Sequence, residues 1–481
     1  MSQSAVELIL AGLPMVAIVV LLLLRVRPLH AVLIVIVATL ALSPWFPVTS
    51  SALQDSVGSL SFSVLSAVFI MLGGIVLSEF LSTSGAQNRI SEWLSHAAGT
   101  RERSVLLLGL GIAPLAESVI GFGVGVITTV PLLLRTGLSP TRAAAVSLLG
   151  IILAPWGSMG PGLLITTGMS GVGLSELGVW SAVLNFPVQC VMGAAIGIVG
   201  LGTVVLRRYI AEILVATVAM WLVLVATNAW VTPALGGILA SFAGIIVFIA
   251  LARLRSGPRI SMDSATRQSF SPYASLVVVM AAATGLAGVV DLGSWEKTLT
   301  GPALWIMVIA MVAPLMLGMS RSEIPAAVER GARLWLPICT LTLLYIVFGA
   351  LLSMNGMSSR LAEEATDMGS PFLFLIPAIG AVSGYVTNSG SASAALVTVG
   401  ITEASHSLGT DTATALAMQN VATGAAIMMC PARVAVAAGV ADSLRGECEG
   451  SVDTRWIMKV VLAANAVVVG LLTVLVAVVL T

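Results

Sequence analysis

The sequence predicts an all-α integral membrane protein, with about 12 transmembrane helices and two broken hairpins in an inverted repeat. Three observations lead to this fold class: an apolar composition, the lengths of the apolar runs, and a repeat within the chain. Of the 481 residues, 58% are hydrophobic and 9% are charged, whereas a soluble protein carries about 25% charged residues. Together with a mean hydropathy of +1.06, this composition indicates that the folded chain has lipid as its solvent.

Composition also argues against several classes of protein. The formal net charge is zero, so nothing points to nucleic acid as a partner. The 4 cysteines and 3 histidines are scattered, without the close spacing that a disulfide framework or a metal site requires. We therefore expect neither a metal nor another cofactor.

The first predicted span covers residues 6–24. No basic residue precedes this apolar run, and Arg25 and Arg27 follow it. A secretory signal peptide begins with basic residues, so this segment is expected to stay in the membrane as a helix.

Apolar runs of about 20 residues can cross the hydrocarbon core as helices. The predicted spans are 6–24, 29–46, 63–82, 141–167, 180–206, 210–228, 234–252, 273–290, 302–319, 335–354, 411–440 and 456–480. Two further apolar stretches, 104–135 and 371–403, are interrupted by small and polar residues. Each is predicted to form a hairpin that enters and leaves the membrane on one side.

The distribution of Lys and Arg predicts the orientation, because cytoplasmic loops of membrane proteins are rich in both. With the N-terminus outside and each broken stretch folded as a hairpin, nearly all of the 22 basic residues lie inside. Lys297 and Arg360 then lie outside, and Arg433 falls within a span. This arrangement places both termini on the extracytoplasmic side.

The two broken stretches occupy corresponding places in two halves of the chain. Ser84-Gly85 recurs as Asn355-Gly356, 271 residues later. At the same spacing, TRAAAVSLLG (141–150) aligns with TATALAMQNV (412–421). The identities are weak and involve small residues, so chance similarity is the alternative, but the constant offset and the matching hairpins favour a true repeat.

We assign residues 1–208 and 273–481 to the two repeats, and residues 209–272 to a linker of two spans and a cytoplasmic loop. Each repeat holds an odd number of spans, which inverts the second repeat relative to the first. Inverted repeats with interrupted helices are typical of secondary transporters, whose binding site lies near the membrane midplane where the interruptions meet. The sequence contains no H-E-x-x-H, G-x-S-x-G or P-loop motif that would indicate an enzyme.

The first break, PLAESVIGFGVGV (114–126), contains an ionisable side chain in an apolar setting. Burying Glu117 charged and alone would be costly, so it is expected to be protonated, paired or facing water. A carboxyl in a site with little water can exchange a proton near neutral pH, which suits a proton-coupling group. The alternative is a residue at the water-facing edge of the hairpin, paired with a loop arginine.

The residues after Glu117 are candidates for substrate binding: Ser118, Gly121, Phe122 and Gly123. Glycine lets the backbone approach a ligand closely. The helix that follows points its N-terminus, with a partial positive charge, at the break. Tight helix packing through small residues is the alternative interpretation of the glycines.

The second break, SGYVTNSGSASAAL (383–396), is rich in hydroxyl and amide groups. The candidate binding residues are Thr387, Asn388, Ser389, Ser391 and Ser393. Asn388 stands where the repeat places Glu117. Hydroxyls and an amide can replace the water shell of an anion without a fixed charge, although some of them are expected to bond back to helix carbonyls instead.

Arg433 lies within a predicted span, next to a proline that frees helix carbonyls. Its guanidinium is well shaped to clamp the carboxylate of a substrate. The alternatives are an ion pair with Glu117 or Asp442, and a side chain that reaches the cytoplasmic face. Gln419 and Asn420 are expected either to line the same cavity or to hydrogen-bond neighbouring helices.

At these two breaks the sequence resembles the L-lactate permease family of bacterial 2-hydroxymonocarboxylate/proton symporters. In that family the first break carries Glu, a short run of small residues and Gly-Phe-Gly, which Glu117 and Gly121-Phe122-Gly123 match. The second break carries Thr-Gly-Ser-Asp-Thr-Ser-Ser-Asn, matched in type and spacing by Thr387, Ser389, Ser391 and Ser393. The resemblance covers most of the chain and implies the same layout of spans, with both ends outside.

The chain departs from the family pattern near the second break. The acidic residue of the family is Gly390 here, and its terminal Asn is Ala394. Where the family tends to carry Gln, this chain has Ala432, followed by Arg433. An acid is lost and a base is placed nearby, so the pocket is expected to be more positive, which would suit a dianion, a sulfonate or an aromatic acid.

The leading interpretation is proton-coupled symport of a small organic anion, such as lactate, glycolate or another monocarboxylate, in the cytoplasmic (inner) membrane of a bacterium. The alternatives are a sodium-coupled carrier of a dicarboxylate or sulfonate, and a cation/proton antiporter. The expected partners are the anion, protons or sodium ions, and the lipid bilayer. The sequence leaves open whether the protein forms a homodimer.

Overall fold

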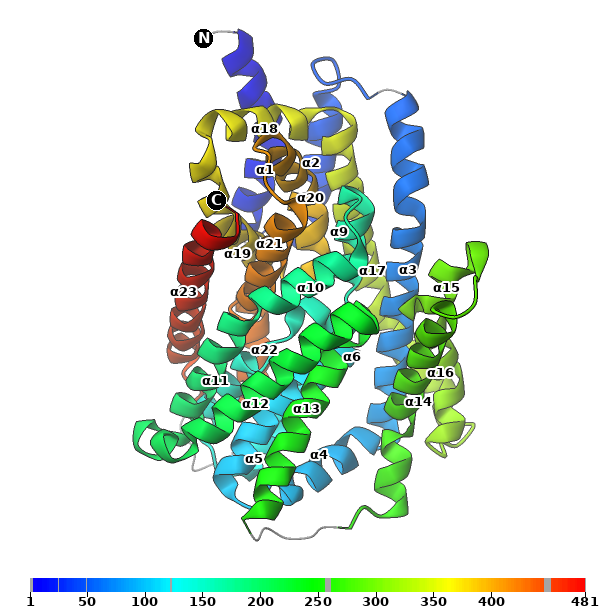
Figure 1. Ribbon diagram of the computed structural model, residues 1–481, viewed down its shortest axis with the longest axis vertical. Coiled ribbons are helices and arrows are strands. Elements are labelled where there is room, and N and C mark those ends of the chain that lie inside the picture. Colours follow the sequence, from blue (N-terminus) through cyan, green and yellow to red (C-terminus); the bar gives the residue numbers. More distant parts are fainter. Residues whose placement is uncertain are drawn as a thin grey trace.

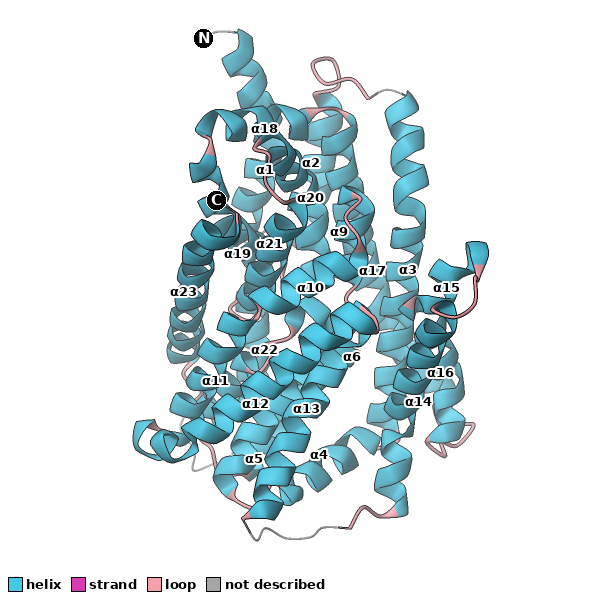
Figure 2. Ribbon diagram, viewed as in Figure 1, coloured by secondary structure: helices cyan, strands magenta, loops and turns pink. Residues whose placement is uncertain are grey.

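The computed structural model is a bundle of helices whose long axis is vertical in Figure 1. It describes residues 3–24, 26–48, 50–121, 123–255, 261–444 and 451–480, and none of these residues forms a β-strand (Figure 2). The predicted all-α fold class is confirmed. Large apolar side chains such as Val16 and Met311 are strongly exposed on helix surfaces, as expected for a protein surrounded by lipid.

The first half of the chain forms α1 (Gln3–Leu23), α2 (Pro28–Ala41), α3 (Ser50–Thr83), α4 (Ala86–Ala97), α5 (Arg101–Leu107), the π-helix η1 (Leu108–Ile112), α6 (Ala113–Val119), α7 (Val124–Arg135), α8 (Pro140–Leu149), the 3-10 helix η2 (Ala154–Met159), α9 (Pro161–Ser170), α10 (Leu174–Leu184) and α11 (Phe186–Leu201). Two linking helices follow, α12 (Thr203–Trp230) and α13 (Pro233–Leu254). The second half forms α14 (Ser264–Ala287), η3 (Gly293–Trp295), α15 (Glu296–Thr300), α16 (Pro302–Met316), α17 (Glu323–Met354), α18 (Met357–Met368), η4 (Ser370–Leu375), α19 (Ile376–Thr387), α20 (Gly390–Ser407), α21 (Thr412–Ile427), α22 (Pro431–Ser443) and α23 (Thr454–Val479).

Nine segments of the described chain are long and apolar enough to cross a membrane, or eleven if each of two bent helix pairs counts as one span. The predicted number of spans is therefore approximately right. Individual spans differ from the prediction: the helix expected over 29–46 is α2, only 14 residues long. The span expected over 180–206 is a pair of helices, α10 and α11, bent by 43°.

The prediction of one continuous span over residues 141–167 is wrong. α8 ends at Leu149, and the backbone is non-helical at Gly157 and Ser158 before α9 begins at Pro161. Proline removes helix hydrogen bonds and glycine permits left-handed backbone, so this apolar run forms two helices around an interruption. The span predicted over 411–440 contains two helices, α21 and α22, but Thr412–Ser443 as a whole is long and apolar enough to be one span.

Both predicted hairpins fold back on themselves. Arg101, before the first hairpin, donates hydrogen bonds to the carbonyls of Thr136 and Gly137 after it, at 2.5 and 2.8 Å. In the second hairpin, Phe372 from the first arm packs with Ala404 from the second. The two ends of each hairpin therefore lie on the same side of the molecule.

Corresponding elements of the two halves run in opposite directions. α4 and α18 each have 12 residues and each follow a left-handed glycine, Gly85 and Gly356. α4 lies at the lower end of the view in Figure 1 and α18 at the upper end. α3 and α17 are antiparallel neighbours, because Arg330 near the start of α17 pairs with Glu79 near the end of α3 at 3.0 Å. The residue boundaries assigned to the repeats stay a prediction.

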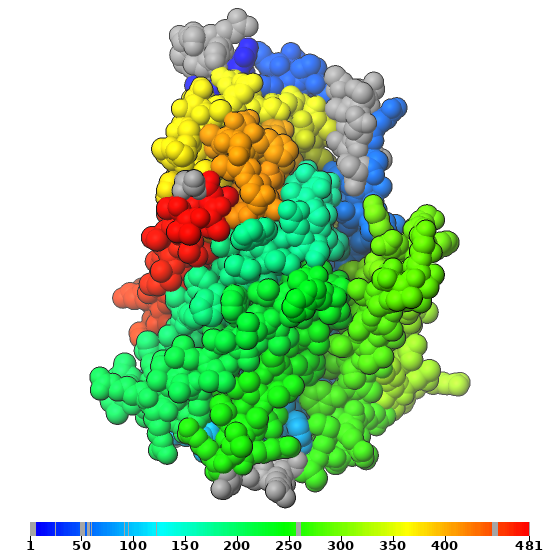
Figure 3. Space-filling model, in the orientation of Figure 1, coloured from blue at the N-terminus to red at the C-terminus, as the bar shows by residue number. Residues whose placement is uncertain are grey.

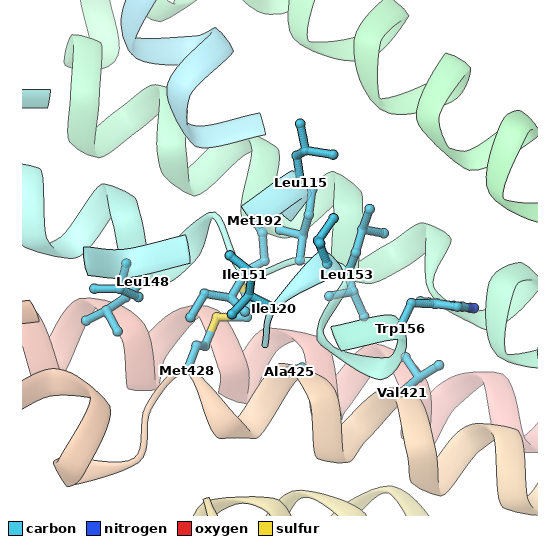
Figure 4. Close-up of a cluster of buried hydrophobic side chains, with 14 of the residues drawn as sticks. Leu115, Ile120, Leu148, Ile151, Leu153, Trp156, Met192, Val421, Ala425 and Met428 are labelled. Atoms are coloured by element: carbon cyan, nitrogen blue, oxygen red, sulfur yellow. The ribbon is translucent and has the colours of Figure 1, made fainter. Parts of the chain in front are cut away.

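The interruptions meet in the interior. The π-helix η1 packs tightly on α13, since a Cβ on Gly111 would lie 2.7 Å from Ile245. In Figure 3 the helices α12 and α13 cover the first hairpin on this face. Figure 4 shows one apolar cluster that joins Ile120 of the first hairpin, Ile151 beside η2 and Met428 at the end of α21. This cluster fixes three interrupted segments relative to one another.

Candidate functional site

The first hairpin turns through a short left-handed segment. α6 ends at Val119, and Gly121 (φ +74°) and Gly123 (φ +87°) lead into α7. Residues with a side chain adopt such angles only with strain. A Cβ on Gly121 would also lie 2.0 Å from Oγ of Ser158, so contact as well as conformation requires glycine here. Phe122 lies outside the residues that the structure describes.

The carboxylate of Glu117 lies at the end of α6, buried and paired. Its side chain is 3% exposed, and Nη1 of Arg433 donates to Oε1 at 2.7 Å. The backbone N–H of Gly123 lies 3.1 Å from Oε2 and 3.4 Å from Oε1. The sequence left open a protonated, a paired or a water-facing carboxyl, and the structure places a paired one at the hairpin tip.

Arg433 bridges the two hairpin tips. While Nη1 contacts Glu117, Nε donates to Oδ1 of Asn388 at 3.1 Å. Asn388 is one of the non-glycine residues with left-handed backbone (φ +53°) and marks the turn between α19 and α20. Among the alternatives for Arg433, the structure therefore shows an ion pair with Glu117. The guanidinium nevertheless lines the cavity described below, where it could also bind an anion.

The polar residues of the second break divide into two groups. Ser393 contacts the hydroxyls of Ser383 (2.6 Å) and Thr423 (2.9 Å), and Gln419 donates to Thr423 at 2.8 Å. Thr387 bonds back to the carbonyl of Ser383 at 2.7 Å. Ser393 and Gln419 thus help to hold α19, α20 and α21 together, and Thr387 bonds within α19 and the adjacent tip. Asn388, Ser389 and Ser391 line the cavity.

Of two other predicted site residues, Ser118 does not line the cavity, whereas Asn420 does. Ser118 is fully buried against α13, where a Cβ on Gly237 would lie 2.3 Å from its Oγ. Asn420 lines the cavity and also donates to the hydroxyl of Ser181 in α10 at 3.2 Å. Ser118 thus contributes to packing, and Asn420 has both of the roles that the sequence left open.

The interruption around η2 adds residues that sequence analysis treated as part of a span. Ser158 (φ +53°) and Met159 (φ +64°) are both left-handed, and such backbone costs roughly 1–3 kcal/mol per residue and is common at functional sites. The hydroxyl of Ser158 donates to the carbonyl of Ile120 at 2.5 Å, which ties η2 to the first tip. The prolines and glycines of APWGSMGPG (154–162) were the signal that could have identified this segment.

A cavity lies where the two tips, η2 and the starts of α9 and α22 meet. Together with the open space at its mouth, it spans about 470 Å³. The lining residues are Glu117, Gly121, Ala154, Pro155, Gly157, Ser158, Pro161, Gly162, Asn388, Ser389, Gly390, Ser391, Asn420, Ile427 and Arg433.

Four helices begin at or beside this cavity. α7 follows the first tip, α20 begins at Gly390, α9 at Pro161 and α22 at Pro431. The first N–H groups of a helix have no partner within the helix, and the N-terminus carries roughly half a positive elementary charge. Among the lining residues, the charges of Glu117 and Arg433 cancel. The four N-termini supply positive partial charge and N–H groups without helix partners, which suits an anion, while α6, α19 and α21 bring their C-termini to the same region.

Comparisons with known proteins agree with this architecture. Among solved structures, the YdaH transporter of Alcanivorax borkumensis is similar, with 14% sequence identity, a TM-score of 0.50, and coverage of 89% of this chain and 87% of that chain. MtrF of Neisseria gonorrhoeae, described as illuminating a class of antimetabolite efflux pumps, has 12% identity, a TM-score of 0.48, and coverage of 88% and 82%. At such identity the likeness to YdaH shows the fold alone. No curated protein matches the sequence.

The model of one protein family, L-lactate permease, matches the chain in two segments, residues 7–283 and 269–480. The two segments together span nearly the whole chain. The match agrees with the multi-pass architecture and with the transporter fold. The chain therefore belongs to the L-lactate permease family and is a membrane transporter.

Proposed function

We propose that the protein carries a small organic anion of the lactate type across the membrane by proton-coupled symport. The observation that supports this most directly is the cavity at which four helix N-termini and Arg433 converge. A carboxylate there would replace its water shell with backbone N–H groups, the hydroxyls of Ser389 and Ser391, and the guanidinium. Family membership makes a lactate-type anion the first substrate class to test.

The pair of Glu117 and Arg433 supplies a mechanism for coupling. When Glu117 is ionised, it occupies Nη1 of Arg433 at 2.7 Å and competes with an incoming anion. A proton on Glu117 removes that competition and frees the guanidinium for the substrate carboxylate. Proton and anion therefore favour each other's binding, which is the requirement for symport.

Glu117→Gln tests this coupling, because glutamine resembles the protonated acid in shape and charge. In proteoliposomes, the variant should retain exchange of labelled anion for unlabelled anion and lose accumulation driven by a proton gradient. Glu92→Gln is the matched control, since Glu92 forms an exposed pair with Arg135 far from the cavity. Accumulation by Glu117→Gln against a gradient would show that another group couples the proton.

The substrate and the coupling ion can be separated in the same assay. A panel of hydroxy acids, keto acids, dicarboxylates and sulfonates should compete with labelled lactate in order of their fit to the cavity. Uptake measured at fixed pH with and without sodium should be unchanged under the proposed mechanism. A strict requirement for sodium would instead support the alternative, a sodium-coupled carrier.

The positions of the basic residues support the proposed orientation, with both termini extracytoplasmic. Around α4, Arg89 donates to Ser269 at 3.0 Å, and Arg135 pairs with Glu92. Arg101 also lies at this end. Cationic side chains gather preferentially on the cytoplasmic side, so the α4 end of the molecule is the proposed cytoplasmic end in the inner membrane.

A further inference from the structure

A second cavity lies between the first hairpin and the long helices α3 and α17. Including its open mouth, it spans about 1020 Å³ of empty space, against about 470 Å³ measured in the same way for the cavity at the hairpin tips. Helices α3, α4, α7 and α17 all contribute to its wall. Its polar lining is Ser78, Glu79, Ser82, Gln87, Asn88 and Thr128.

The six polar lining residues suit a space filled with water, although Ile75, Ile120, Val124, Ile127, Pro131, Leu334 and Ile338 make the rest of the wall apolar. They belong to the end of α3, the start of α4 and the first turns of α7, in a chain that is otherwise strongly apolar. Glu79 is paired with Arg330, and the amide of Gln87 contacts the hydroxyl of Thr128. Such groups would be costly to face lipid, but a water-filled space between helices satisfies them.

The inner end of this cavity reaches the substrate cavity. Ile120 and Val124 line the second cavity, while Gly121, next to Ile120, lines the first. The carbonyl of Ile120 accepts the hydrogen bond from Ser158, and Ser158 also lines the first cavity. One turn of backbone at the hairpin tip therefore separates the two spaces.

We propose that the second cavity is an aqueous vestibule through which the hydrated anion and the proton reach the substrate cavity from the α4 end, with Ile120 as the barrier between them. The inference rests on the proposed function, because a charged substrate needs a path through water to a site this far inside the molecule. The polar side chains keep the path wet, and the charged one among them, Glu79, is paired with Arg330 and is of the same sign as the anion, so it would not hold it.

Two adjacent threonines of α7 provide a matched test. Thr128 lines the vestibule, whereas Thr129 is fully buried and bonds back to the carbonyl of Gly125 at 2.6 Å. Each is changed to cysteine in a background without the native cysteines, and inverted membrane vesicles are treated with a charged thiosulfonate. Reaction requires a thiolate in water, so Thr128→Cys should be labelled at least about tenfold faster than Thr129→Cys.

The other outcomes overturn the proposal. Equal labelling of the two variants would show that Thr128 does not face water. Labelling of Thr128→Cys only by a lipophilic maleimide would show that the space holds lipid. Labelling only in right-side-out vesicles would show that it opens at the other end.

A bulky substitution gives a second, functional measurement. Thr128→Trp should reduce the rate of anion uptake about tenfold, because it fills the path without touching the substrate cavity. The control is Val16→Trp, on a strongly exposed surface of α1. Normal uptake by Thr128→Trp would exclude the vestibule as the route, whereas absence of anion uptake by the unmodified protein would refute the proposed function instead.

Discussion

Gly121→Ala should destabilise the first hairpin tip by an amount that the geometry predicts. A residue with a side chain at φ +74° costs roughly 1–2 kcal/mol more than glycine. The new Cβ would lie 2.0 Å from Oγ of Ser158, so that hydroxyl has to move and give up its hydrogen bond to the carbonyl of Ile120. Loss of that bond adds about 1 kcal/mol, for a total of roughly 2–3 kcal/mol.

The assay is an unfolding titration of the purified protein in detergent, compared with Gly439→Ala. Gly439 lies in α22 with no neighbouring atom within 4 Å of a new Cβ, so alanine there should be neutral or slightly stabilising. Ser158→Gly added to Gly121→Ala should recover about 1 kcal/mol, since it removes the clashing Oγ and relaxes a left-handed residue. If Gly121→Ala were as stable as the unmodified protein, or if the second change brought no recovery, the proposed contact between the tip and η2 would be refuted.

Two further predictions concern buried charges. Arg433→Gln leaves Glu117 buried without its guanidinium partner, and should lower the stability by about 3–5 kcal/mol and weaken anion binding in a thermal-shift titration. The double variant Glu117→Gln, Arg433→Gln should unfold later than Arg433→Gln alone, and an earlier transition would argue against the pair. Glu212→Gln removes the carboxylate that pairs with Arg103 at 2.8 Å and with Arg255 at 2.9 Å. This variant should lose a similar amount of stability and keep its affinity for the anion. A changed affinity would contradict a purely structural role for Glu212.

The elements that the sequence predicts best are those in which polarity changes abruptly. Glu117 and the serines after Asn388 interrupt otherwise apolar runs, and both hairpins turn at these points. The break at η2 escaped prediction because its glycines, its tryptophan and its methionine are not strongly polar, and an average over 20 or so residues conceals them. Pro155 and Pro161 were the better guide there, since Pro155 is the second residue of η2 and Pro161 the first residue of α9.

The roles of individual hydroxyls depend on tertiary packing. Gly380 and Gly384 let α19 approach α21 so closely that a Cβ on either would lie 2.5 or 2.6 Å from its backbone. That approach turns Ser393 into an interhelical hydrogen-bonding group, while Ser391 lines the cavity. Residue type alone does not distinguish the two serines, because the distinction is made by a helix contact between segments distant in the sequence.

The repeat explains why the charged residues at the site differ between the halves. It places Asn388 opposite Glu117, and Gly162 opposite Arg433. A fully symmetric site would bring two acids or two bases together in a region with little water, and their repulsion would be severe. With one acid from the first repeat and one base from the second, the pair joins the halves, and Asn388 accepts a second hydrogen bond, from Nε of Arg433. Transport requires a movement that exposes the cavity alternately to the two sides of the membrane. If the Glu117–Arg433 pair stays intact, both hairpins must move together past α3 and α17. In the empty carrier, with Glu117 ionised, separation of the tips would instead leave two buried charges without partners, at a cost of several kcal/mol.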